Sequence, residues 1–148
     1  MTLQDWLRHS SLVAHRTSAQ EIRGLLEVAR RDLADSQVKG LSLDASFNLA
    51  YNSMLQVALA ALAASGHRIA RGVSHHHFAI QSLAHTIGCD AGLIDKLDRF
   101  RKKRNISDYE QAGTVSEQEA ATMVALARDL GGRVAEWLRQ KHPELLEA

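Results

Sequence analysis

The sequence predicts an all-α protein, built as an antiparallel up-and-down bundle of four principal helices, or five. Three observations predict this fold: apolar residues recur at spacings of three and four, no stretch alternates with period two for long enough to be a strand, and capping residues and glycines divide the chain. The chain has 148 residues, one proline and no internal repeat, so we expect a single domain over residues 1–148 with its core at about residues 18–141. A short helix at residues 3–9 is compatible with this fold, and the mostly short connections favour antiparallel neighbours.

The first two long helices each begin at a serine and end at a glycine. Ser18, with Glu21 three residues later, has the pattern of a capping box, and Gly40 is expected to end this helix. The second helix is expected to begin at Ser42 and to end at Gly66. Alanine is common on several sides of the second helix, which predicts that it lies at the centre of the bundle.

Two shorter helices are expected next, over residues 74–88 and 90–105. Ser74 and Asp90 are their predicted N-caps. The end of the second near Asn105 fits the tolerance of asparagine for the left-handed conformation that closes helices.

The last helix is expected to begin at Ser116, where Glu119 again completes the pattern of a capping box. Gly131 and Gly132 should each weaken this helix by about 1 kcal/mol relative to alanine. Pro143 marks its predicted end.

The charges of the chain are unevenly spread. The net charge is +1, so charge balance alone predicts neither a nucleic-acid nor a membrane partner. Residues 66–104, however, hold eight basic and three acidic residues, and five of the cations fall within residues 99–104 at a predicted helix end. One interpretation is a solvated helix end, because cations there interact favourably with the helix dipole.

The register of Arg101 and Arg104 favours a more specific interpretation. They follow Leu97 and Phe100 by four residues each and so fall beside the apolar stripe. A guanidinium group there needs an anion-binding groove, for phosphate or an RNA backbone, or a buried carboxylate partner. Candidate partners are Asp108, Asp129 or an acid on a neighbouring helix.

No metal site and no cofactor are expected. Residues 75–77 are three consecutive histidines, which point about 100° apart on a helix and cannot converge on one ion. His76 or His77 is a candidate proton carrier if it faces the basic groove. Cys89, the single cysteine, has no identifiable base in the sequence.

The composition favours a cytoplasmic protein without a membrane partner. One cysteine excludes an intramolecular disulfide framework, and the N-terminus lacks the apolar core of a signal peptide. The apolar-rich stretch at residues 45–66 contains several polar side chains and is too polar for a membrane span.

Three blocks of the sequence carry a family resemblance. They are Phe47-Asn-Leu-Ala-Tyr51 through Gly66-His67-Arg68, Ser74-His-His-His-Phe-Ala-Ile80 through Leu83, and Phe100-Arg-Lys-Lys-Arg-Asn-Ile-Ser-Asp-Tyr109. In this order, across roughly residues 20–140, they resemble the HEPN superfamily of small helical-bundle proteins. The third block is similar to the family signature, in which an Arg is followed after four to six residues by His, one further residue and Tyr.

The resemblance implies a bundle that is often dimeric, with the signature lining a cleft at the dimer interface. Many members are metal-independent ribonucleases, frequently the toxin of a toxin–antitoxin pair, and others bind nucleotides, RNA or proteins without cleavage. Here Arg101 and Tyr109 match the signature, but Ser107 occupies the position of the His. Serine cannot shuttle protons near pH 7, and general acid–base catalysis contributes about 10²–10⁴-fold to a rate.

Three hypotheses follow for the function. The first is an RNA- or nucleotide-binding regulatory module with an impaired nuclease site. The second is a metal-independent ribonuclease with a rearranged site that uses Asp108 or a histidine such as His76. The third is a protein-interaction bundle, antitoxin-like or only dimerising, in which the arginines form structural ion pairs. The candidate anion- or RNA-binding residues are Arg101, Arg104, Asn105, Ser107 and Tyr109, with His76 and Asp108 as secondary candidates.

Overall fold

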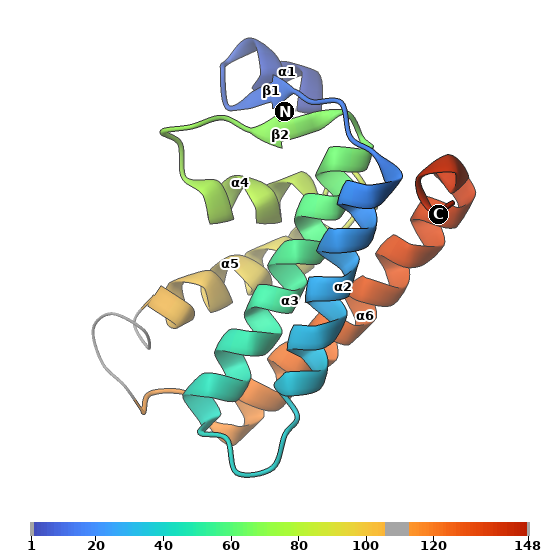
Figure 1. Ribbon diagram of the computed structural model, residues 1–148. Coiled ribbons are helices and arrows are strands. Elements are labelled where there is room, and N and C mark those ends of the chain that lie inside the picture. Colours follow the sequence, from blue (N-terminus) through green and yellow to red (C-terminus); the bar gives the residue numbers. More distant parts are fainter. Residues whose placement is uncertain (1, 106–112, 148) are drawn as a thin grey trace.

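The computed structural model describes residues 2–105 and 113–147, which form six α-helices, one pair of short strands and a final 3₁₀ helix (Figure 1). The helices are α1 (Leu3–Arg8), α2 (Ala19–Asp35), α3 (Leu43–Ala64), α4 (His75–Ser82), α5 (Ala91–Asn105) and α6 (Glu117–Lys141). The strands are β1 (Leu12–Ala14) and β2 (His67–Ile69), and the 3₁₀ helix is η2 (Pro143–Leu145). The prediction of a mostly helical protein is confirmed, including the short N-terminal helix.

The three long helices lie side by side, and the two shorter ones lie across them. Figure 1 shows α2 and α6 packed along α3, with α4 and α5 crossing α3 at an angle. Helix α2 runs opposite to α3, whereas α3 and α6 run in the same direction because α4 and α5 intervene between them (Figure 1). The finer prediction of a four-helix up-and-down bundle is therefore not confirmed.

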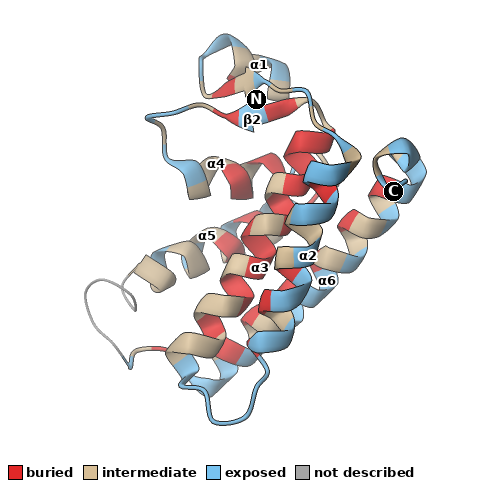
Figure 2. Cartoon of the chain, in the orientation of Figure 1, coloured by how far each residue is buried: buried red, intermediate tan, exposed pale blue. Residues whose placement is uncertain are grey.

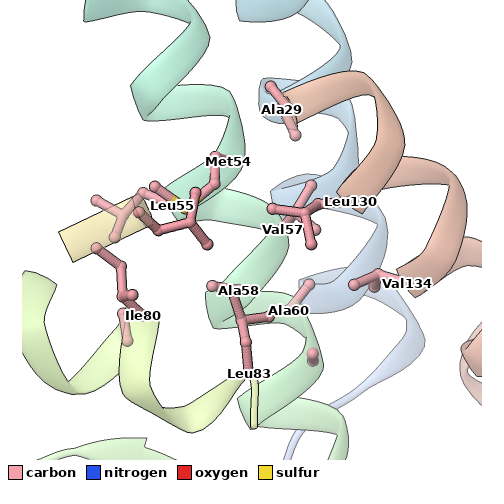
Figure 3. Close-up of a cluster of buried hydrophobic side chains, with 14 of the residues drawn as sticks. Ala29, Met54, Leu55, Val57, Ala58, Ala60, Ile80, Leu83, Leu130 and Val134 are labelled. Atoms are coloured by element: carbon pink, nitrogen blue, oxygen red, sulfur yellow. The ribbon is translucent and has the colours of Figure 1, made fainter. Parts of the chain in front are cut away.

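Helix α3 is the centre of the core, as its alanines predicted. Most of its residues are buried (Figure 2), and the helix contacts α4 on one side and α2 and α6 on the other (Figure 1). Figure 3 shows Leu55 near Ile80 of α4 and Val57 near Leu130 of α6. Among the described helices, α3 alone is long and apolar enough to cross a membrane, and 72% of the relevant window is buried inside the protein. That burial is typical of the core helix of a soluble protein.

Four of the predicted helix N-caps form. Ser18, Ser42 and Ser116 accept backbone hydrogen bonds at 3.0–3.1 Å, and Asp90 accepts one from Leu93 at 2.8 Å. The full capping box forms at Ser116. The expected box at Ser18 is incomplete, because the carboxylate of Glu21 accepts hydrogen bonds from Thr17 and His15 instead.

Two helices end earlier than predicted. Helix α2 stops at Asp35 rather than at Gly40, because the hydroxyl of Ser36 donates to the carbonyl of Leu33 and Ser46 of α3 donates to the carbonyl of Ser36. Helix α4 stops at Ser82 rather than at Gly88. After α4 the chain continues in tight turns, in which backbone N–H groups donate to the carbonyls three residues earlier. At the start of α4, the side chain of Ser74 makes no capping hydrogen bond.

Two short strands form a small sheet that the all-α prediction did not include. Strand β1 pairs with β2 in antiparallel register, with Leu12 opposite Ile69. Gly66 follows α3 with a φ of +90°, which turns the chain directly into β2, and its carbonyl accepts a bond from His15. Strands of three residues are too short for alternation to identify them, and their partners are far apart in the sequence.

Candidate functional site

The end of α5 meets α4 and the buried face of α3 in a cluster of ionisable side chains. We call this cluster the arginine–histidine site and define it by Tyr51, His76, Asp98, Arg101 and Arg104. Helix α3 supplies the tyrosine, α4 the histidine, and α5 the aspartate and both arginines.

Tyr51 connects the core to the site. Its side chain is 1% exposed, and its Oη lies 3.0 Å from Nδ1 of His76. Burial raises the pKa of Tyr51 far above its ordinary value, although Arg104 and Arg101 act in the opposite direction. The phenol therefore stays neutral and is a fixed hydrogen-bonding partner for the imidazole.

Arg104 lies against the same tyrosine. Its guanidinium carbon is 5.7 Å from the centroid of the Tyr51 ring, within the range of a cation–π interaction. The position follows from the packing of α5: Phe100, one turn earlier, meets Phe47 edge-on with centroids 5.4 Å apart, and Leu97 is fully buried. Arg104 extends from this apolar stripe, as its register predicted.

Arg101 has a carboxylate partner on its own helix. Its Nε donates to Oδ1 of Asp98 at 2.8 Å, and Nδ1 of His77 and Nζ of Lys102 lie 3.5 and 3.6 Å from the same carboxylate. The hydrogen bond from Arg101, its positive charge and His77 lower the pKa of Asp98 against the effect of burial. Asp98 stands three residues before Arg101 on the same helix, whereas the partners expected from the sequence were Asp108, Asp129 or an acid on a neighbouring helix.

His76 is the group in this site whose ordinary pKa lies nearest to neutral pH. Burial lowers its pKa first, and the positive charges of Arg104, His75 and Arg101 lower it further. The imidazole is therefore mostly neutral at pH 7, with one nitrogen that donates and one that accepts. When Nδ1 carries the proton and donates to Tyr51, Nε2 is the acceptor.

The structure brings together some of the predicted site residues. Arg101, Arg104 and Asn105 lie half-buried in the last turns of α5, and the secondary candidate His76 joins the two arginines. Ser107, Asp108 and Tyr109 lie outside the described residues.

The three consecutive histidines diverge, as predicted. His76 contacts Tyr51, His77 contacts Asp98, and His75 is exposed. Within residues 2–105 and 113–147, no three His, Cys, Asp or Glu side chains are grouped closely enough to hold a metal ion. Cys89 is buried, and burial raises the pKa of its thiol, which makes it a poor nucleophile.

No model of a protein family matches the chain, and no curated protein sequence matches it. A function is therefore inferred from the geometry of the arginine–histidine site.

Proposed function

We propose that the arginine–histidine site binds phosphate groups of RNA or of a nucleotide, in a HEPN-like regulatory module. The observation that carries the proposal is the convergence of Arg101 and Arg104 beside a neutral histidine at one helix end. Guanidinium groups match the geometry of phosphate oxygens, and an imidazole N–H or a phenol adds neutral donors.

The local charge balance supports an anionic ligand. Asp98 is contacted at once by His77, Arg101 and Lys102, so one carboxylate faces several potential cations. Nearby, Lys103 lies 3.6 Å from Glu119 of α6. The excess positive charge at the end of α5 attracts phosphate and predicts binding that weakens as salt is added.

The sequence resemblance extends the proposal beyond the site. A HEPN-like chain is expected to act as a homodimer in the cytoplasm, with a link to a toxin–antitoxin pair. The mostly helical fold is compatible with a HEPN-like bundle, and the proposed dimer would place two arginine–histidine sites in one assembly.

A second candidate function is a metal-independent ribonuclease, and the position of His76 favours it. Ser107 occupies the signature histidine position, and His76 approaches the arginines from another helix. Nε2 of His76 would accept the proton of the RNA 2′-hydroxyl while the 2′-oxygen attacks the adjacent phosphorus. The products would be a 2′,3′-cyclic phosphate and a 5′-hydroxyl, whose oxygen takes a proton from the imidazolium or water. Arg101 and Arg104 would stabilise the added negative charge.

One experiment separates these functions. End-labelled RNA is incubated with the protein in EDTA and run on native and denaturing gels. The test variant is Arg101→Gln/Arg104→Gln, and the matched control is Arg99→Gln, an exposed arginine on the same helix. We expect a mobility shift that the double variant loses and the control keeps.

Each other outcome has a distinct meaning. Cleavage that disappears in His76→Gln but survives in His75→Gln would establish the ribonuclease. If the gels show no mobility shift and no cleavage, and Arg101→Gln lowers the thermal stability, both proposals are overturned. That result would favour the protein-interaction bundle.

A further inference from the structure

A pocket lies at the C-terminal end of α3, between α2, β2 and the beginning of α4. Its volume is about 360 Å³, or roughly twelve times the share of one water molecule in the liquid. Its apolar wall includes Leu25 of α2, Leu62 of α3 and Ile69 of β2. This size and lining suit a small organic molecule with a compact apolar body.

The pocket also carries positive charge. Arg68 and Arg71, both exposed, line it together with His75. No ion pair with either arginine occurs among the residues that the structure describes. Two guanidinium groups at the edge of an apolar pocket are suited to a carboxylate or phosphate group.

His67 adds a buried polar residue beside the pocket. It is one of the lining residues, it is 8% exposed, and its Nδ1 is buried without a hydrogen-bond partner within the described part of the chain. Because this nitrogen has almost no accessible surface, the exposed arginines are the groups that a bound molecule would meet.

The one carboxylate in the pocket lining is already engaged. Oε1 of Glu21 lies 2.6 Å from the hydroxyl of Thr17 and 2.8 Å from Nε2 of His15. These hydrogen bonds lower the pKa of Glu21, the bond from Thr17 most of all, so Glu21 is ionised but its Oε1 is occupied. The two positive charges of Arg68 and Arg71 therefore outnumber the one negative charge of Glu21, and the pocket favours an anion.

We infer that this pocket binds a small organic anion, whose carboxylate or phosphate meets Arg68 and Arg71 and whose apolar body lies against Leu62 and Ile69. None of the five residues that define the arginine–histidine site lines the pocket, although His75, which does, has its ring centroid 6.3 Å from that of His76. Leu59, which also lines the pocket, is eight residues beyond Tyr51 on α3, or about 12 Å along the helix. The inference therefore does not depend on the proposed RNA binding.

The test uses small aromatic compounds with the full chain. Phenyl phosphate and benzoate represent the two anion chemistries, and benzamide is the neutral control of the same shape. Binding is measured by calorimetry and by the shift in melting temperature. We expect saturable binding of at least one anion and none of benzamide, and the stronger anion identifies the preferred chemistry.

Two kinds of variant place the binding in this pocket. Arg68→Gln/Arg71→Gln should weaken it at least tenfold, whereas Arg99→Gln on α5 should leave it unchanged. Ala70→Phe, which keeps every charge and adds a ring at the pocket wall, should also abolish it, and circular dichroism checks that each variant folds. Failure of both anions to bind, equal binding of benzamide, or equal binding to the double variant would overturn the inference.

Discussion

The phenol oxygen of Tyr51 lies 3.0 Å from Nδ1 of His76, although 25 residues separate the two in the chain. Tyr51 belongs to the buried face of α3, and His76 stands in the first turn of α4. The hydrogen bond therefore joins a titratable imidazole to the buried face of the central helix. It also holds that imidazole beside the two arginines that the sequence had indicated.

The first prediction concerns the titration of His76. Its pKa should fall below 6.5, because burial and then the charges of Arg104, His75 and Arg101 oppose protonation. The unfolded chain then binds more protons than the folded chain between the two pKa values. The contribution to stability is thus complete above about pH 6.5 and is lost as the pH falls towards the folded value.

NMR titration of the imidazole resonances measures this pKa directly. Arg104→Gln should raise the pKa of His76, because Arg104 is the charge that lowers this pKa most. Arg99→Gln should leave the pKa of His76 unchanged. A His76 midpoint at or above 6.5 in the wild-type protein would contradict the described contacts.

The second prediction concerns Asp98, which holds Arg101 at 2.8 Å. Asp98→Asn should strengthen RNA binding several-fold and steepen its dependence on salt, because it removes a competing carboxylate from the site. Asp95→Asn, an exposed change on the same helix, is the control in the same binding assay. If the pair is only structural, Asp98→Asn will lower the melting temperature and leave RNA binding absent.

The third prediction tests the packing of α2 on α3. The carboxylate of Asp32 is 3% exposed and accepts a hydrogen bond from the amide of Asn52 at 2.5 Å. Asn52→Ala removes this hydrogen bond from the buried carboxylate of Asp32. The change should lower the free energy of unfolding by about 1–3 kcal/mol. Urea unfolding measures the change. Gln20→Ala, exposed on α2, should change stability by less than about 0.5 kcal/mol.

The fourth prediction concerns a glycine inside α6. A Cβ atom at Gly132 would meet no atom within 4 Å, and the residue is exposed and helical. Gly132→Ala should therefore raise the free energy of unfolding by about 0.5–1 kcal/mol. Gly40→Ala should have the opposite effect, because Gly40 has a φ of +91°. Thermal unfolding of the two variants compares them, and a destabilised Gly132→Ala would show that α6 needs the small residue for another contact.

Most helices could be predicted from the sequence, because the chemistry that makes them is local. A capping serine or aspartate acts on the backbone three residues later, and an apolar stripe is defined within a few turns. Ser42, Asp90 and Ser116 were therefore identified correctly as N-caps. Arg101 and Arg104 were selected by the same local logic, from their distance to Leu97 and Phe100.

Which of these parts meet depends on the folded chain as a whole. The pairing of Leu12 with Ile69 and the contact of Tyr51 with His76 join segments that share no local pattern. The parallel course of α3 and α6 likewise depends on how α4 and α5 cross the core (Figure 1). Such contacts are selected by the burial of a whole apolar surface, a property of the folded chain that no short window of sequence contains.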